Sequence, residues 1–255
     1  MQLQHLKVLF LVMSCVKYRD RQKAVLDTWY PQLADRCQFR IIEGGHVGPA
    51  REEGNKLLLP CPDGYWSNPT KVLTALRYAQ SHFEFDYLVK CDDDMYLHVE
   101  RFFSLDTADA DYIGVHIHDR PAGKRFASGG LYLLSRRSVS QILEFSESHS
   151  EEFFSFGPDG GEGHEDVSIG HALARQGITL REDARINTSR FPTPYQSRTV
   201  VSCHWATPSR MRRIHRSAAR PLRINQAIGL VEHAVERTRR TLAKARQRFL
   251  PGLSL

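Results

Sequence analysis

Apolar and polar positions over the first 180 residues of the chain follow two different periods. Short, mostly apolar runs predict strands, and longer segments with apolar side chains at helical spacing predict helices. The predicted strands lie near residues 6–13, 37–42, 86–91, 111–116, 127–134 and 178–180. The predicted helices lie near residues 21–33, 68–83, 135–143 and 164–174. Strands that alternate with helices indicate a layered α/β domain with a mixed, mostly parallel sheet.

The strand near 86–91 ends in three consecutive carboxylates, Asp92, Asp93 and Asp94. Open α/β folds bind ligands at the carboxyl ends of their strands. Adjacent carboxylates repel one another, so we expect a cation beside them, and oxygen ligands suit Mg²⁺ or Mn²⁺. A solvated acidic turn explains the triplet equally well at this point.

Residues with strong local preferences mark the ends of several elements. Asn68 and Pro69 are typical of a helix cap and a first helical position, and Ser135 is typical of a second cap. Residues 157–163 contain four glycines and one proline, which predicts a loop before the helix that begins near Glu165.

Composition narrows the class of protein without naming an activity. Of the 255 residues, 41% are hydrophobic and 25% charged, as in ordinary globular proteins. No apolar run approaches the ~20 residues that span a bilayer, and the run at 6–13 lacks a signal-peptide cleavage site. The five cysteines show no paired short spacing, so we expect buried thiols in a reducing compartment.

Positive charge is concentrated at the carboxyl end of the chain. The whole chain carries a net charge of +6, yet residues 207–255 hold twelve Lys or Arg and two Glu, a net charge of +10. The mildly acidic remainder does not resemble a nucleic-acid-binding protein. We therefore predict a domain at 1–206 and a basic helical tail at 207–255.

The tail also shows a repeating pattern that begins after Pro221. Positions 224, 228, 231, 235, 238, 242, 245 and 249 alternate spacings of four and three and are mainly apolar. This seam predicts a helix that docks on the main domain, forms a dimer, or lies on an anionic membrane surface.

Six blocks of the chain, in order, resemble the β-1,3-galactosyltransferase family, which is glycosyltransferase family 31 and includes the fringe-type enzymes. The resemblance covers roughly residues 6–206. The blocks are 21–29, 63–73, the Asp-Asp-Asp triplet at 92–94, the Ser-Gly-Gly segment at 127–135, Glu-Asp-Val-x-x-Gly at 165–170, and Cys-His-Trp at 203–205. Gln22 departs from the family pattern, which often has a second Arg there, and Ser67-Asn68-Pro69 stands where the family has Asn-Leu-Thr.

The resemblance implies a GT-A type nucleotide-sugar-binding fold and an inverting transferase. The enzyme would move galactose, N-acetylgalactosamine or N-acetylglucosamine from a UDP-sugar to a glycan hydroxyl, forming a β-1,3 linkage. Asp94 and His204 would bind Mn²⁺, with Mg²⁺ as the alternative, while Asp92 and Asp93 would act through water, the ribose or neighbouring contacts. The family's membrane anchor is not present in this sequence, so we expect a cytoplasmic, membrane-associated protein, or one in the Golgi lumen if an anchor was removed.

The resemblance also implies a general base that removes the proton of the acceptor hydroxyl. Asp166 is our candidate, and its neighbour Glu165 is the alternative. Without the resemblance, Asp166 would be interpreted as a first-turn acid stabilised by the helix dipole.

Other candidates concern the donor and the acceptor. Arg21 and Lys71 are expected to contact the nucleotide, and the glycine pair Gly129–Gly130 is expected to let the backbone approach the donor sugar. Tyr65 and Trp66 could stack on uracil or on an acceptor sugar, or they could anchor their loop.

Two other functions fit parts of the pattern. A phosphohydrolase would need a nucleophilic aspartate after the first strand, where Ser14 and Cys15 stand instead. A non-catalytic carbohydrate-binding protein would not need Asp94, Asp166 and His204 together.

Overall fold

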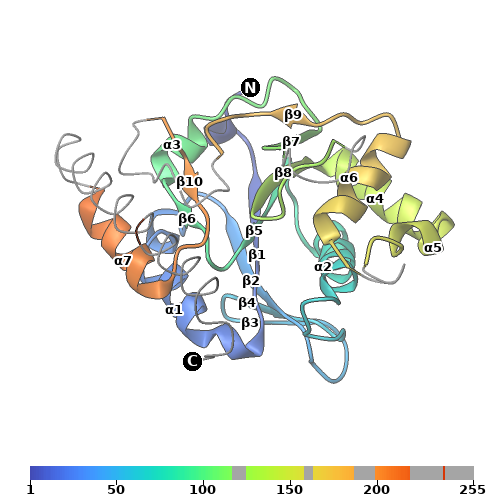
Figure 1. Ribbon diagram of the computed structural model, residues 1–255, viewed down its shortest axis with the longest axis horizontal. Coiled ribbons are helices and arrows are strands. Elements are labelled where there is room, and N and C mark those ends of the chain that lie inside the picture. Colours follow the sequence, from blue (N-terminus) through green and yellow to red (C-terminus); the bar gives the residue numbers. More distant parts are fainter. Residues whose placement is uncertain (117–124, 158–162, 187–198, 219–237, 239–255) are drawn as a thin grey trace.

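The computed structural model describes residues 1–116, 125–157, 163–186, 199–218 and 238. Its main feature is an eight-stranded mixed sheet in the order β3-β4-β2-β1-β5-β8-β7-β9 (Figure 1). These strands are β1 (Val8–Met13), β2 (Gln38–Glu43), β3 (Arg51–Glu53), β4 (Lys56–Leu58), β5 (Tyr87–Asp92), β7 (Tyr112–Gly114), β8 (Leu131–Ser135) and β9 (Arg181–Glu182). A separate ribbon pairs β6 (Tyr96–Leu97) with β10 (Ser202–Cys203).

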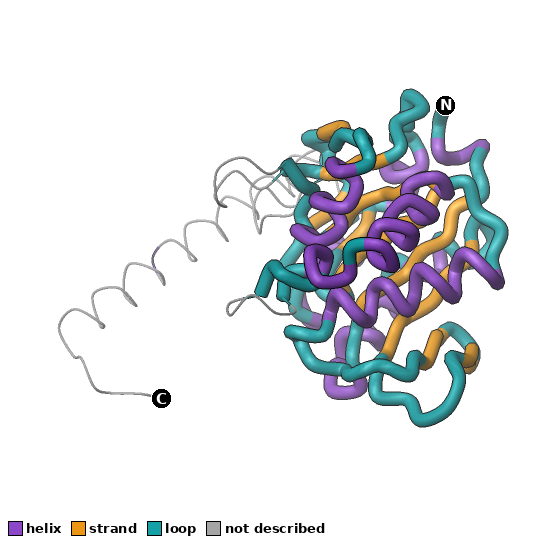
Figure 2. Tube along the Cα trace, turned by 90° about the vertical axis from the view of Figure 1, so that its right-hand side faces the viewer, coloured by secondary structure: helices purple, strands orange, loops and turns teal. Residues whose placement is uncertain are grey.

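Helices cover both faces of this sheet (Figures 1 and 2). They are α1 (Arg19–Asp27), α2 (Asn68–His82), α3 (Val99–Phe103), α4 (Arg136–Ser148), α5 (Ser150–Phe153), α6 (Glu165–Arg175) and α7 (Pro208–Ser217). Short 3-10 helices lie at Leu3–His5, Val16–Tyr18 and Tyr30–Gln32. The predicted mixed, mostly parallel sheet flanked by helices is confirmed.

Strand β1 lies at the centre because both of its neighbours run parallel to it and all six of its residues are buried. Its side chains alternate between the two faces. Phe10 packs in a core with α1, α3 and α7, whereas Leu11 packs in a second core with α2, α4 and α6. Trp29 fills the first core and donates its indole N–H to the Met95 carbonyl oxygen at 2.9 Å. The two cores therefore hold β1 and β5 rigidly, and β5 ends at Asp92.

Some element boundaries differ from those that the pattern predicts. Helix α1 ends at Asp27 and gives way to a 3-10 turn around Pro31, and the segment at 51–58 forms the hairpin β3–β4. Ser67, rather than Asn68, occupies the cap of α2 and makes no capping bond with its side chain. Ser135 caps α4 as predicted, since its hydroxyl accepts a hydrogen bond from Ser138 N at 3.1 Å.

The first residues of the predicted tail form α7 and pack on the main domain. Met211 and Ile214 are fully buried in the core that also contains Val25 of α1. The seam at 224–249 lies outside the described residues apart from position 238, as does most of the predicted loop at 157–163. The division at 206 therefore stays a prediction. Among the described helices, none has the length and apolar character of a membrane span.

All five cysteines lie in the described part of the chain and none forms a disulfide. Cys61, Cys91 and Cys203 are buried, and Cys15 and Cys37 are half-buried. Burial raises the pKa of Cys37 to about 12, which keeps this thiol protonated and unreactive at neutral pH.

Candidate active site

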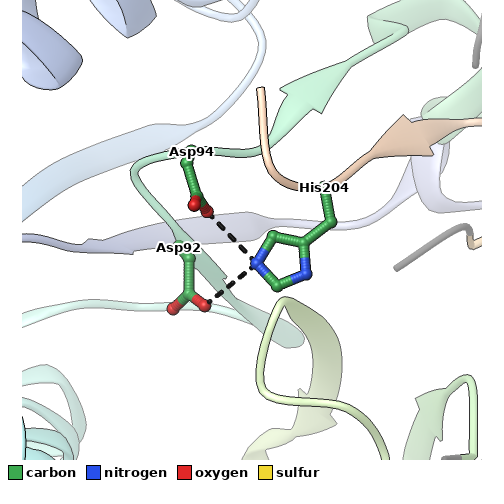
Figure 3. A group of neighbouring side chains, drawn as sticks. All are labelled: Asp92, Asp94 and His204. Atoms are coloured by element: carbon green, nitrogen blue, oxygen red, sulfur yellow. Dashed lines mark ion pairs between the residues drawn. The ribbon is translucent and has the colours of Figure 1, made fainter. Parts of the chain in front are cut away.

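The carboxyl end of β5 and the end of β10 bring an imidazole to the acidic triplet. The ribbon pairs Cys203 with Tyr96, and Ala206 N donates to the Asp94 carbonyl oxygen at 2.9 Å. These bonds fold the chain back so that His204 lies beside Asp92 and Asp94 (Figure 3). Residues that are far apart in the sequence therefore form one cluster.

The geometry of this cluster suits a divalent cation. His204 Nε2 lies 3.2 Å from Asp94 Oδ1 and 3.6 Å from Asp92 Oδ2. One ligand atom from each residue lies within 4.8 Å of the others. Asp94 Oδ1 is buried and, apart from this imidazole, has no polar partner among the described residues. Two carboxylate oxygens and one imidazole nitrogen form a donor set typical of Mn²⁺ or another divalent first-row metal.

Electrostatics within the cluster favour an ionised Asp92 beside a protonated His204. Burial opposes the charged form of His204, but hydrogen bonds to Asp92 and Asp94 raise its pKa to about 9. Burial also opposes the charged form of Asp92, yet Lys90 and His204 lower its pKa to about 2. A cation bound here would replace the imidazole proton as the positive charge between the two carboxylates.

Asp93 turns to a different set of partners. Its carboxylate accepts hydrogen bonds from Ser14 Oγ at 2.7 Å and from Arg21 Nη1 at 3.1 Å. Gln22 donates to the same Ser14 hydroxyl at 3.0 Å. Burial raises the pKa of Asp93 to about 6 despite these bonds. Asp93 therefore ties the acidic turn to β1 and α1 and is not part of the His204 cluster.

Arg21 lies beside the acidic turn, where its positive charge would attract the phosphates of a bound ligand. Its Nη1 is 3.6 Å from Asp94 Oδ2, and its guanidinium packs 4.1 Å from the centre of the Tyr18 ring. About a third of the side chain is exposed. Its position agrees with the expected nucleotide contact, which stays a prediction.

The Lys71 ammonium is bound by a carboxylate and a backbone carbonyl of the protein. It is buried and lies 2.7 Å from Asp63 Oδ1 and 3.0 Å from the Ser14 carbonyl oxygen. Asp63 also accepts hydrogen bonds from Val16 N and Gly44 N at 2.9 and 2.8 Å. Although burial opposes it, hydrogen bonds from Lys71 and these two amides lower the pKa of Asp63. The expected contact of Lys71 with a nucleotide is a prediction that this geometry does not test.

Replacing Lys71 with Met is expected to lower the free energy of unfolding by about 2–4 kcal/mol, because the partner carboxylate would stay in a mostly buried position without its cation. Urea denaturation followed by circular dichroism measures this loss. Lys7→Met is the control, since Lys7 and its partner Glu84 are both exposed and solvent screens such a pair, which therefore contributes little to stability. Equal losses for the two variants would contradict the structural role of Lys71.

Asp166 lies in the first turn of α6, where it is buried beside the glycine pair. Its Oδ2 accepts a hydrogen bond from Gly129 N at 3.1 Å, and its Oδ1 accepts one from Val167 N at 2.9 Å. The neighbouring Glu165 instead forms an ion pair with Lys90 at 2.6 Å. Burial raises the pKa of Glu165 to about 7 even though Lys90 opposes this. Glu165 is thus bound to an ammonium, whereas the described hydrogen bonds to the Asp166 carboxylate come from backbone amides. The expected role of Asp166 as general base stays a prediction.

Lys90 is the residue that sequence reasoning missed. It is buried within β5 and lies 2.8 Å from Asp92 Oδ1, and it also donates to the Gly129 carbonyl oxygen and to Glu165. One ammonium thus joins the Asp92–Asp94–His204 cluster to the start of α6. A lysine inside an apolar strand is itself a signal, because a buried cation needs anionic partners nearby.

The glycine pair makes room for side chains from both halves of the site. A Cβ atom on Gly130 would lie 2.9 Å from His204 Nδ1, and one on Gly129 would lie 3.0 Å from Glu165 Oε1. His204 and the Glu165–Asp166 pair therefore flank two consecutive residues. The donor-sugar contact expected for these glycines stays a prediction.

Gly130→Ala is expected to displace the His204 imidazole and weaken Mn²⁺ binding by at least about tenfold. In other metal sites, loss of the contacts that orient a metal-binding side chain lowers affinity by a similar factor. Isothermal titration calorimetry with MnCl₂ measures the change. Gly64→Ala is the matched control, because a Cβ there would make only ordinary contact, 3.8 Å from Ser67 Oγ. Unchanged Mn²⁺ affinity in Gly130→Ala would argue against His204 as a ligand.

Comparison with known proteins finds a family model that matches one segment of the chain. Residues 49–116 match the family model described as galactosyltransferase, a segment that includes Lys71, Lys90 and the acidic triplet. The blocks that contain Arg21, Gly129, Asp166 and His204 lie outside that match. Among curated protein sequences, none matches the chain.

Solved structures share the fold at low sequence identity. A glycosyltransferase involved in glycosylation of the major capsid of PBCV-1 superimposes with a TM-score of 0.51 and 10% identity, over 82% of this chain and 98% of that one. The galactosyltransferase LgtC, in complex with donor and acceptor sugar analogues, gives a TM-score of 0.48 and 12% identity, over 87% and 95% of the two chains. The fold assignment depends on the first of these. Residues 49–116 are thus similar to the galactosyltransferase family model, and the chain shares the mixed α/β fold of a GT-A glycosyltransferase.

Proposed function

We propose that this protein is a metal-dependent, inverting glycosyltransferase that moves a hexose from a UDP-sugar to a hydroxyl of an acceptor glycan, with a β-1,3 linkage as the expected product. The observation that carries the proposal is the convergence of Asp92, Asp94 and His204 next to a further carboxylate, Asp166, across the glycine pair. In such a site, one part would stabilise the leaving group and the other would activate the attacking hydroxyl.

The first part of the site would hold the leaving diphosphate. Asp94 and His204 would bind the cation, with Asp92 beside them, and a bound divalent ion would neutralise the negative charge that develops on the diphosphate. The nitrogen ligand favours Mn²⁺, with Mg²⁺ as the alternative. Arg21 supplies further positive charge at the same turn. These residues would hold the donor with its sugar toward the glycine pair.

The second part would activate the acceptor. Asp166 would accept the proton of the acceptor hydroxyl while that oxygen forms a bond to the anomeric carbon and the bond to the diphosphate oxygen breaks. Hydrogen bonds from Gly129 N and Val167 N fix the orientation of the Asp166 carboxylate. One base on the face opposite the leaving group is what direct displacement with inversion requires.

A screen of UDP release tests the proposal directly. Purified protein is incubated with UDP-galactose, UDP-N-acetylgalactosamine, UDP-N-acetylglucosamine and UDP-glucose, with Mn²⁺, with Mg²⁺ and with EDTA. We expect release from one donor, dependent on the metal. Proton NMR of the product's anomeric signal then reports its configuration. Glycan binding in calorimetry without any response to UDP or Mn²⁺ would instead indicate a non-catalytic carbohydrate-binding protein.

The environment of β1 gives no support to a phosphohydrolase. Ser14 and Cys15 follow this strand, and the Ser14 hydroxyl donates to Asp93. The nucleophilic aspartate that such an enzyme would need at this position is not present in the sequence.

We also propose that the protein is cytoplasmic and associates with anionic membranes through its basic tail. Residues 221–255 contain seven Lys or Arg and two Glu. Basic residues near an anionic surface contribute about 1 kcal/mol each, so deletion of 221–255 is expected to lower binding to phosphatidylserine vesicles at least about tenfold. Co-sedimentation measures this, with neutral vesicles as the control. Equal partitioning of the full and shortened chains would contradict the proposal and leave docking on the main domain or dimerisation, the latter tested by light scattering, as the role of the seam.

A further inference from the structure

Two large aromatic side chains stand exposed on the loop that precedes α2. Tyr65 is 64% exposed and Trp66 is 50% exposed, and their rings meet edge to face at 5.0 Å. Exposed aromatic residues that adjoin one another in a soluble protein are candidates for ligand binding. Their position decides which ligand.

The loop that carries them is fixed at both ends. Asp63, before the pair, and Lys71, after it, form the buried ion pair described above. Between them, Ser67 N donates to the Gly64 carbonyl oxygen and Asn68 N donates to the Tyr65 carbonyl oxygen, each at 3.3 Å. A rigid loop holds an aromatic ring in place before a ligand arrives, which lowers the entropy lost on binding.

Trp66 lies near the start of α6, on the side of the site that contains Asp166 (the base side). Its indole ring meets the His164 ring edge to face, with centroids 5.9 Å apart. His164 immediately precedes Glu165 and Asp166 at the start of α6. The indole is therefore tied to the same turn that presents the Asp166 carboxylate.

The metal side has a different exposed aromatic residue. Trp205 is 57% exposed and stacks on the His204 ring with centroids 4.7 Å apart. Its backbone has a φ of 57°, which is unfavourable for a bulky residue and is retained mainly where the surroundings impose it. Trp205 thus lies beside the Asp92–Asp94–His204 cluster, and Trp66 lies beside the residue that precedes the Glu165–Asp166 turn.

We propose that Trp66, supported by Tyr65, stacks on a pyranose ring of the acceptor glycan and places its hydroxyl toward Asp166. The inference rests on the proposed function, because it assigns the base side of the site to the acceptor. A pyranose has one face of C–H groups that packs on an aromatic face, while its hydroxyls remain available at the edge. Since the donor's diphosphate is assigned to Asp92, Asp94 and His204, the aromatic surface beside His164, at the start of the turn that carries Asp166, is left for the second substrate.

Steady-state kinetics of UDP release test the assignment. The acceptor probes are the methyl β-glycosides of galactose, glucose, N-acetylgalactosamine and N-acetylglucosamine, with the donor that the wild-type protein uses. Trp66→Ala is expected to raise the KM for the preferred glycoside about tenfold, a loss typical of truncating a buried tryptophan contact. The KM for the UDP-sugar and the slow hydrolysis of the UDP-sugar without acceptor should not change, and Trp66→Tyr should recover most of the acceptor affinity.

The controls separate this inference from the proposed function. Val47→Ala shortens another exposed apolar side chain, 92% exposed on the loop after β2, and should leave both KM values unchanged. A higher donor KM with an unchanged acceptor KM in Trp66→Ala would overturn the inference and assign the indole to uracil, with the transferase activity intact. Unchanged values for both substrates would overturn it as well. If the wild-type protein released no UDP from any donor, the proposed function itself would fail, and the inference with it.

Discussion

Replacing Asp94 with Asn is expected to weaken Mn²⁺ binding at least about a hundredfold and to abolish metal-dependent binding of UDP. The asparagine side chain keeps the shape of the carboxylate but loses the charge, and a hard divalent cation depends on that charge for binding. Asp94 Oδ1 is also the buried oxygen whose polar partner among the described residues is the His204 imidazole, so the site has no substitute for it. Calorimetric titration with MnCl₂, followed by UDP, measures both losses.

Asp20→Asn is the matched control, because Asp20 is an exposed acid in the first turn of α1. It should bind Mn²⁺ and UDP as the wild-type protein does. Urea denaturation of both variants shows whether the fold persists. A folded Asp94→Asn protein with wild-type Mn²⁺ affinity would mean that the cation binds elsewhere or not at all.

Replacing Asp166 with Asn is expected to lower kcat about 10²–10⁴-fold, the range typical for loss of a general base. Binding of UDP and Mn²⁺ should change less than about twofold. The asparagine amide oxygen can still accept the hydrogen bond from Gly129 N, and the Asp92–Asp94–His204 cluster lies on the other side of the glycine pair. Kinetics of UDP release and calorimetry on the same preparation separate the two effects.

Glu151→Gln serves as the control for this variant, since Glu151 is an exposed first-turn acid of α5. Normal turnover by Asp166→Asn would remove Asp166 from the role of base and turn attention to Glu165. The Glu165 carboxylate would then have to release the Lys90 ammonium, with which it forms a 2.6 Å ion pair, before it could accept a proton from substrate.

The fold was largely predictable because its central strands are buried, apart from the half-buried Asp92 at the end of β5. β1 and β5 are apolar runs of six residues in which Lys90 and Asp92 are the charged positions, and the surrounding helices repeat apolar side chains at helical spacing. The strands β6, β9 and β10 contain two residues each, too few for any period to appear. Such strands are defined by the partners that pair with them, and these partners are distant in sequence.

The residues of the candidate site came from the family resemblance, but the contacts that connect them were not predicted. The resemblance supplied Asp94, His204 and Asp166, which the structure brings to one end of the sheet. It did not supply the role of Gln22, whose amide holds the Ser14 hydroxyl at the acidic turn. Nor did it indicate that the glycine pair accommodates side chains of this chain. Contacts of this kind depend on packing between elements, which no local pattern encodes.

The ribbon of β6 and β10 has a consequence for how the protein is made. During synthesis, the acidic turn leaves the ribosome more than a hundred residues before the imidazole that completes its cluster. Until Cys203 has paired with Tyr96, the nascent chain presents only carboxylates, which bind transition metals less selectively than a mixed nitrogen and oxygen set. A divalent ion that binds this cluster would therefore be acquired only after translation has passed His204, and bound metal would indicate that the ribbon has formed.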